Sequence, residues 1–190
     1  MDFYELVLRN RSCRCFRESP KIELSLLEDL VGLARLTASA NNSQPLKYIL
    51  SADEISNSSI FPYLSWAAQL KDWEGPKEGE RPAAYIVILG DKTISEKIDC
   101  DHGIAAQTIL LGAVERGLGD CIIGSIERGA LRKELGIRDK YNVLLVIALG
   151  KPSEKVVLEN VEENGDTSYW RDDRGVLHVP KRKMQEIIIQ

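Results

Sequence analysis

The chain has 190 residues, of which 44% are hydrophobic and 28% charged. These proportions are ordinary for a globular protein and exclude disordered and fibrous classes. Its 25 basic and 29 acidic residues give a net charge of −4, which disfavours a general nucleic-acid surface. The longest apolar runs, 83–89 and 143–149, fall far short of the roughly 20 residues of a membrane helix, so we expect none.

The start of the chain carries Asp2 and Glu5, where a secretory signal would be basic and then apolar. We therefore expect a cytoplasmic protein. In that reducing compartment its four cysteines are expected to be free thiols.

Apolar spacing predicts a short amphipathic helix over 3–11, which leads into a cluster of arginines. Ser25 and Glu28 have the spacing of a capping box and are followed by an apolar stripe, which predicts a second helix. This helix is expected to fade near 38–42.

Residues 46–51 and 83–91 are predicted strands, the second covered on both faces because it is apolar almost throughout. Between them, 64–82 is expected to hold a short helical piece and a loop, and loops of this length are often functional. Its Trp66 and Trp73 are candidates for the wall of a substrate pocket. The alternative is that these tryptophans fill the core or a subunit interface, and for Trp66 this alternative is favoured.

Residues 101–118 are apolar on nearly every side, which predicts a helix buried in the core or in a subunit interface. A short strand over 120–126, a helix over 127–135 and a strand over 141–150 follow. The polar, turn-rich residues 151–180 offer little to bury, and we expect them to wrap over the core or over a second copy of the chain.

Several common sites are disfavoured by spacing. Glycine-rich nucleotide motifs and the Gly-x-Ser-x-Gly nucleophile motif are absent. The possible zinc ligands Cys13, Cys15, Cys100 and His102 lack the usual two-residue spacing, so no metal site is expected. A dithiol centre would also lack its usual spacer, although nearby arginines would favour thiolates.

The stretch LRNRSCRCFR, 8–17, holds four arginines in an acidic chain. Guanidinium groups make bidentate contacts with phosphate, and a serine hydroxyl with backbone amides can complete the site. The alternative is a basic helix end that satisfies the helix dipole. Spacing alone leaves both open.

A second polar stretch, 36–48, is rich in small and amide side chains. Asn42 and Gln44 could read the polar edge of a flat heteroaromatic ring, and Pro45 fixes the turn. A plain loop explains the same residues equally well.

Together these stretches resemble the nitroreductase family of FMN-dependent oxidoreductases. The resemblance rests on Arg11-Ser12-x-Arg14-x-Phe16, on SANNSQP at 39–45, on 103–124, on 143–152 and on Lys181-Arg182 before MQEIII. Asn10 departs from it, since many relatives have arginine there, and phosphate affinity could be weaker in consequence.

The resemblance implies an α+β fold, with three α/β/α layers around a central, mostly antiparallel mixed sheet. It also implies a homodimer with flavin at the interface. We expect one domain over 1–190, with a core to about residue 150 and a C-terminal extension over 151–190.

The same resemblance implies FMN contacts. Arg11, Ser12 and Arg14 would hold the phosphate with Lys181 or Arg182. Ser39, Asn42 and Gln44 would contact the ribityl chain or the ring, and the backbone at Ile123 and Gly124 would face N5. No catalytic side chain is identified.

The implied activity is hydride transfer from NADH or NADPH through FMN to a small acceptor such as a nitroaromatic, a quinone, free flavin, an enone or a halogenated aromatic. Two alternatives stay open. One is a protein that binds flavin or senses it without turnover, and the other is a thiol or metal redox protein.

Overall fold

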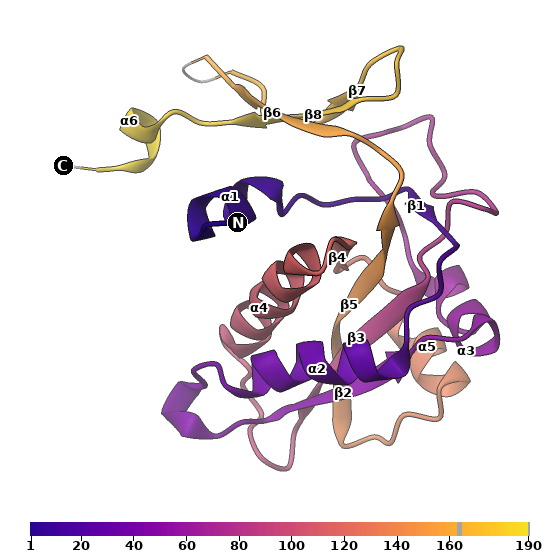
Figure 1. The fold of residues 1–190 in the computed structure, drawn as a ribbon. Helices are drawn as coiled ribbons and strands as arrows, with labels where there is room; N and C mark the ends of the chain where they lie inside the picture. Colours follow the sequence, from indigo (N-terminus) through magenta and orange to yellow (C-terminus); the bar gives the residue numbers. More distant parts are fainter. Residues whose placement is uncertain (163–164, 190) are drawn as a thin grey trace.

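The structure is a computed structural model that describes residues 1–162 and 165–189. Its helices are α1 (Phe3–Arg9), α2 (Leu24–Arg35), α3 (Glu54–Ser58), α4 (Asp101–Glu115), α5 (Arg128–Glu134) and α6 (Met184–Ile187) (Figure 1). Its strands are β1 (Phe16–Arg17), β2 (Leu46–Ser51), β3 (Ala84–Asp91), β4 (Gly119–Ile123), β5 (Tyr141–Pro152), β6 (Val156–Asn160), β7 (Trp170–Arg171) and β8 (Leu177–Lys181).

The main sheet has five strands, in the order β1-β5-β3-β2, with β4 also paired to β5. The long strand β5 is therefore central: β3 and β4 lie on its two sides, and β1 pairs with its last two residues. All four strand pairings are antiparallel. Pairing of Phe16 with Pro152 brings the N-terminal segment beside the start of the tail.

The sheet is covered on both faces, as the continuous apolarity of 83–91 predicted. Along β3, Ile86 and Ile88 pack with α2 and α4, and Tyr85 and Val87 pack with α5 and the segment around Ile60. Successive strand residues point to opposite faces, so one apolar strand supplies both cores. The expected α+β, three-layer fold is confirmed.

Two local predictions are wrong. The Ser25–Glu28 capping box is not used, because α2 begins at Leu24 after Glu23, and no side chain caps it. The helical piece expected at 64–82 is absent from the structure, and a helix lies earlier, at α3, where the Asp53 carboxylate accepts a hydrogen bond from the Ser56 N–H.

The cause of the second error is a long-range pairing. Leu64 forms an antiparallel bridge with Ile126, and the Ser65 N–H donates to the Ser125 carbonyl at 3.0 Å. These contacts hold 64–65 in an extended conformation beside the end of β4.

The tail forms a second sheet that the sequence did not predict. Strand β8 pairs in parallel with β6 and antiparallel with β7, and this sheet lies across the end of the molecule that carries α1 and β1 (Figure 1). Leu177, the first residue of β8, is fully buried. Within the described residues, no helix combines the length and apolarity needed to cross a membrane.

Candidate functional site

A cavity of about 510 Å³ lies where the N-terminal segment, α4, β4 and the tail meet. Its volume is in the range of small-molecule sites. It is lined by Phe3, Val7, Asn10, Arg11, Ser12, Arg14, Gln107, Leu110, Leu111, Asp120, Ile122, Tyr169, Val179 and Lys181.

The four arginines of the N-terminal cluster have different surroundings. Arg11 and Arg14 line the cavity. Arg9 is mostly exposed and pairs with Glu5 on α1, and Arg17 is exposed in β1. The cluster therefore contributes two guanidiniums to the cavity and two to the surface.

Arg11 is held with part of its hydrogen-bonding capacity unused. One terminal nitrogen donates to the Val7 carbonyl at 2.7 Å. Its Nε is buried and has no partner among the described residues. Burial lowers the pKa of this guanidinium, against the opposing effect of the Asp120 carboxyl. A partly buried cation with a buried, unpaired Nε donor is suited to an anion, so the cavity fits a phosphate.

Arg14 lies at the other side of the cavity, with its guanidinium 4.5 Å from the centre of the Tyr169 ring. The Tyr169 N–H donates to Gln69 Oε1 at 2.8 Å. The tail and the 64–82 loop therefore meet beside Arg14, through a cation–π contact and a hydrogen bond.

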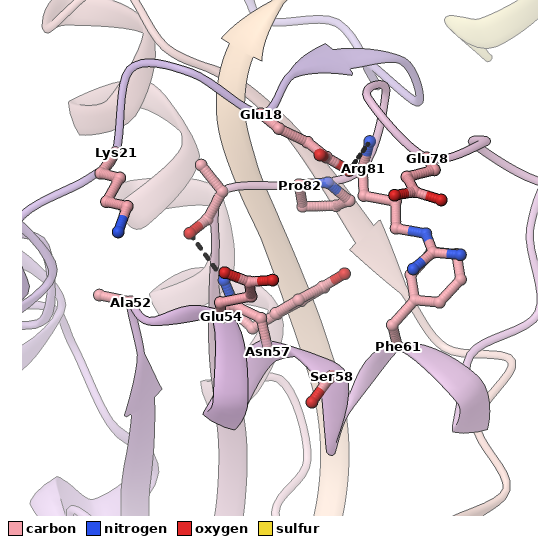
Figure 2. Close-up of a pocket in the computed structure, with 12 residues that line it drawn as sticks. Glu18, Lys21, Ala52, Glu54, Asn57, Ser58, Phe61, Glu78, Arg81 and Pro82 are labelled. Carbon is pink, nitrogen blue, oxygen red and sulfur yellow. Dashed lines mark hydrogen bonds between the residues drawn. The ribbon is translucent and has the colours of Figure 1, made fainter.

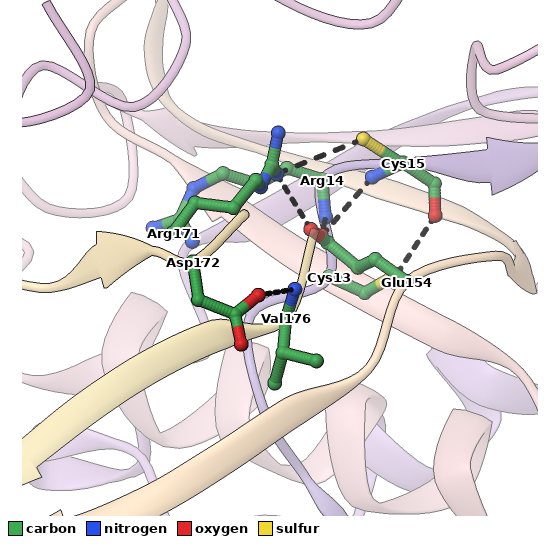
Figure 3. A network of polar contacts seen from close by, with 7 residues as sticks. All are labelled: Cys13, Arg14, Cys15, Glu154, Arg171, Asp172 and Val176. Carbon is green, nitrogen blue, oxygen red and sulfur yellow. Dashed lines mark hydrogen bonds and ion pairs between the residues drawn. The ribbon is translucent and has the colours of Figure 1, made fainter. Parts of the chain in front are cut away.

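A buried carboxylate fixes the backbone that carries Arg14. Glu154 accepts hydrogen bonds from the backbone N–H groups of Arg14 and Cys15, the second at 3.1 Å, and pairs with Arg171 at 2.7 Å (Figure 3). Only 4% of its side chain is exposed. Glu154, two residues after the end of β5, thus ties the N-terminal segment to β7.

The cysteines in this region are protonated thiols. Burial, followed by the charge of Glu154, raises the pKa of Cys15 to about 11 and raises that of Cys13 further. Burial also raises the pKa of Cys121 to about 11. The arginines therefore do not create a thiolate, and the structure disfavours a thiol redox centre.

The possible zinc ligands lie in two places. Cys13 and Cys15 are buried near Glu154, whereas Cys100 is exposed before the first turn of α4, next to Asp101 and His102. Within 1–162 and 165–189, no group of three or more His, Cys, Asp or Glu side chains is placed to hold a metal.

The predicted flavin loop is structured but does not line the cavity. Ser39 Oγ donates to Asp101 at 2.5 Å and accepts the Gln44 N–H at 2.9 Å. Asn42 and Gln44 have φ of 53° and 52°, and their side chains are accessible. Asp101 begins α4 and Gln107 borders the cavity, so about 9 Å of helix separates the two places.

A smaller cavity of about 240 Å³ adjoins the first, because Arg14 and Ile122 line both. Ile123, Gly124 and Trp66 also border it. Trp66 is 9% exposed and belongs to the core cluster below the sheet. It therefore fills the core with most of its surface and borders a pocket with the remainder.

The two C-terminal basic residues separate. Lys181, the last residue of β8, lines the large cavity. Arg182 is not among its lining residues and pairs with Glu186 at 3.5 Å. Of the two alternatives for the phosphate, the geometry favours Lys181.

Another hollow of about 320 Å³ lies on the far side of the N-terminal segment, near α3 (Figure 2). Glu18, Glu54 and Glu78 surround it together with Lys21 and Arg81. The Arg81 guanidinium already lies 4.4 Å from the centre of the Phe61 ring. Three carboxylates make this hollow poorly suited to a phosphate.

Some cavity residues were missed at the sequence level. Gln107, Asp120 and Tyr169 line the cavity and Glu154 supports it. They come from α4, β4 and the tail, and no local pattern links them to the arginines.

A sequence profile of the nitroreductase family matches residues 7–151. Iodotyrosine deiodinase of Drosophila melanogaster is 25% identical over 179 residues, which cover 80% of this chain and 62% of that protein. The chain thus spans about three fifths of the length of that relative.

Solved structures with the same fold are more distant in sequence. A nitroreductase family protein of Clostridium difficile 630 has a TM-score of 0.66 and 23% identity, with 80% of this chain and 86% of that chain covered. An Exiguobacterium sibiricum protein, described as a nitroreductase and solved in complex with FMN, has a TM-score of 0.68 and 19% identity, covering 80% and 89%.

Proposed function

The chain belongs to the nitroreductase family, and from this premise we propose that it is an oxidoreductase that binds FMN, takes hydride from NADH or NADPH and reduces a small acceptor. The observation that carries the proposal is the large cavity, in which the buried Arg11 Nε lacks a partner among the described residues. When bound, FMN would accept and pass on the electrons. The protein then has only to bind FMN and hold it in position.

Four residues of the large cavity would place the FMN phosphate. Arg11, Ser12 and Arg14 would hold the phosphate with Lys181, since all four line one cavity. The ring would extend toward the adjoining smaller cavity, bordered by Gly124. The supply of positive charge at one end and an apolar wall at the other suits a phosphorylated heteroaromatic.

The remaining predicted contacts require a second copy of the chain. Ser39, Asn42 and Gln44 do not line the large cavity, so in a homodimer they would reach the flavin of the partner subunit. Support comes from apolar side chains left open in one chain: Phe3 is 72% exposed on α1 and Ile104 is 40% exposed on α4. Exposed apolar surface of this kind marks association sites.

The primary test is FMN binding by variants of the arginine cluster. Arg11→Ala should weaken FMN binding about ten- to hundredfold, because a hydrogen bond to a charged group contributes about 1.5–3 kcal/mol. It should leave the binding of riboflavin, which lacks the phosphate, unchanged. Arg17→Ala is the matched control, since Arg17 is exposed and outside the cavity lining. Equal losses for FMN and riboflavin would contradict the phosphate assignment.

Two further measurements separate the alternatives. Anaerobic addition of NADH or NADPH should bleach the bound flavin, and a spectrum unchanged by both donors would favour a binding or sensing protein. Light scattering should give a mass twice the 21.3 kDa of the chain. A monomer that still binds FMN tightly would contradict the shared site.

The acceptor is to be found by assay. Nitroaromatics, quinones and enones are the first candidates. The similarity to iodotyrosine deiodinase adds iodotyrosine, with release of iodide as the readout.

A further inference from the structure

The large cavity that Arg11 and Arg14 line also contains a carboxyl group, that of Asp120. Asp120 is fully buried in β4. Alternation along the strand puts Asp120 and Ile122 on the cavity side, while Cys121 and Ile123 join the core cluster. A carboxylate here would repel a phosphate, so its protonation state matters for binding.

The contacts of Asp120 are with neutral groups. Asn10 Nδ2 donates to both carboxyl oxygens, at 2.9 and 3.1 Å, and Gln107 Nε2 donates to Asn10 Oδ1 at 2.9 Å. The amide of Asn10 is thereby fixed in orientation. Arg11 is near enough to affect Asp120 electrostatically, but no ion pair joins the two among the described residues.

Burial affects the pKa of Asp120 more strongly than its hydrogen bonds and neighbouring charges do. It raises the pKa of Asp120 to about 8, while the Asn10 hydrogen bond and then the charge of Arg11 act in the opposite direction. The neutral acid is therefore the favoured form at pH 7. Neutral carboxylic acids of this kind are known in apolar enzyme sites.

In the described part of the chain, the other titratable groups next to Asp120 are one guanidinium and two thiols. The N-terminal segment presents Arg11 and the thiol of Cys13, and β4 itself presents Cys121, whose pKa is raised to about 11. Helix α4 contributes the neutral Gln107, and β5 contributes the apolar Leu149 opposite Asp120.

The remaining cations lie elsewhere on the cavity wall. They are Arg14 and Lys181.

We propose that Asp120 keeps its proton whenever the cavity holds the phosphate of a flavin nucleotide, so that nucleotide binding is coupled to the protonation of this one carboxyl. The inference rests on the proposed function and deepens it. A dianionic phosphate beside Asp120 further disfavours the carboxylate, because like charges in a low-dielectric pocket repel. Binding above the pKa of free Asp120 must then take up a proton, and binding below it need not.

The first experiment is an FMN titration by flavin fluorescence between pH 7 and 9.5. The dissociation constant of the unmodified protein should stay level to about pH 8 and then rise toward tenfold per pH unit, as linkage to one proton requires. Asp120→Asn keeps the shape of the side chain and should give a level profile. Asp91→Asn is the control: Asp91 is 3% exposed but lies at the far end of β3, and its variant should follow the unmodified protein.

Calorimetry of the unmodified protein tests the same point without a substitution. At pH 9, FMN binding measured in two buffers of different ionisation enthalpy should show uptake approaching one proton, and riboflavin should show little. Binding of FMN without proton uptake, or parallel profiles for the unmodified protein and Asp120→Asn, would overturn the inference alone. Failure to bind FMN at any pH would overturn the proposed function, and the inference with it.

Discussion

Glu154→Ala should destabilise the protein more than any other single loss of charge discussed above. The side chain is 4% exposed and accepts from two backbone N–H groups and from Arg171 (Figure 3). Removing the carboxylate leaves those donors together in a partly buried space. Since the two N–H groups belong to Arg14 and Cys15, the backbone of the proposed phosphate site loses its anchor.

The cost follows from burial. Breaking a buried ion pair from one side costs about 3–5 kcal/mol, because the remaining charge is uncompensated. The Arg171 side chain keeps 23% exposure, so water solvates part of it and the lower end, about 3 kcal/mol, is expected. With a urea slope of about 2 kcal/mol/M, the midpoint should fall by about 1.5 M.

The assay is urea unfolding without FMN, followed by circular dichroism and by tryptophan fluorescence. Protomer concentration must be equal for all variants, because association shifts apparent stability. Glu154→Gln keeps one oxygen for the backbone donors and should lose roughly half as much. Glu115→Ala removes the carboxylate of an exposed pair with Arg116 and should lose less than about 1 kcal/mol.

A double-mutant cycle with Arg171→Met isolates the pair. The double variant should be more stable than the sum of the two losses predicts, because Arg171 without Glu154 is itself unfavourable. A loss under about 1 kcal/mol for Glu154→Ala, or strict additivity in the cycle, would refute the assignment of Glu154 as a buried anchor.

Two other predictions concern the contact of Gly150 with Phe16 and the reactivity of the cysteines. Gly150→Ala should cost about 1–3 kcal/mol in urea unfolding, since a Cβ there would lie 2.8 Å from the Phe16 ring; an unchanged midpoint would show that β1 can shift. With a maleimide at pH 7.5, Cys100 should react rapidly and the three buried cysteines only after unfolding, which mass spectrometry can follow. Rapid labelling of Cys15 would contradict its raised pKa.

The sheet could be predicted because the residues of its central strands show directly that both faces are buried. The runs 83–91 and 141–150 are apolar at nearly every position, and only strands covered on both faces need this. Both predictions are confirmed, at β3 and β5. The antiparallel order between them depends on pairing across the chain, and the sequence indicated it only through the family resemblance.

The tail sheet shows the opposite case. Strands β6 and β8 are half-buried, short and paired in parallel, with β7 between them in the chain. Both strands contain apolar residues, such as Val156 and Leu177, but they lie among polar, turn-rich residues. β6 is stabilised by pairing with β8, from Val156 to Leu177, and no local period predicts a partner so far along the chain.

Backbone geometry set by distant residues also explains the wrong prediction at 64–82. The sequence there has helix-forming residues around Trp66, yet the bridge from Leu64 to Ile126 holds the chain extended. Intrinsic helix preference amounts to less than about 1 kcal/mol per residue and gives way to such tertiary contacts. The Ser25–Glu28 cap is not used, because α2 already begins at Leu24, one residue before Ser25.

The charges of the site are the least predictable part, because their effect depends on burial rather than on number. Arg9 and Arg11 are two residues apart, yet Arg9 is paired at the surface, whereas Arg11 is half-buried and its Nε has no partner among the described residues. Asp120 counts as a negative charge in the sequence, but burial in the surrounding core raises its pKa to about 8, against the opposing effect of the hydrogen bond from Asn10. With Asp120 neutral, the cavity is more positive than its residue list indicates, and this difference favours a phosphate.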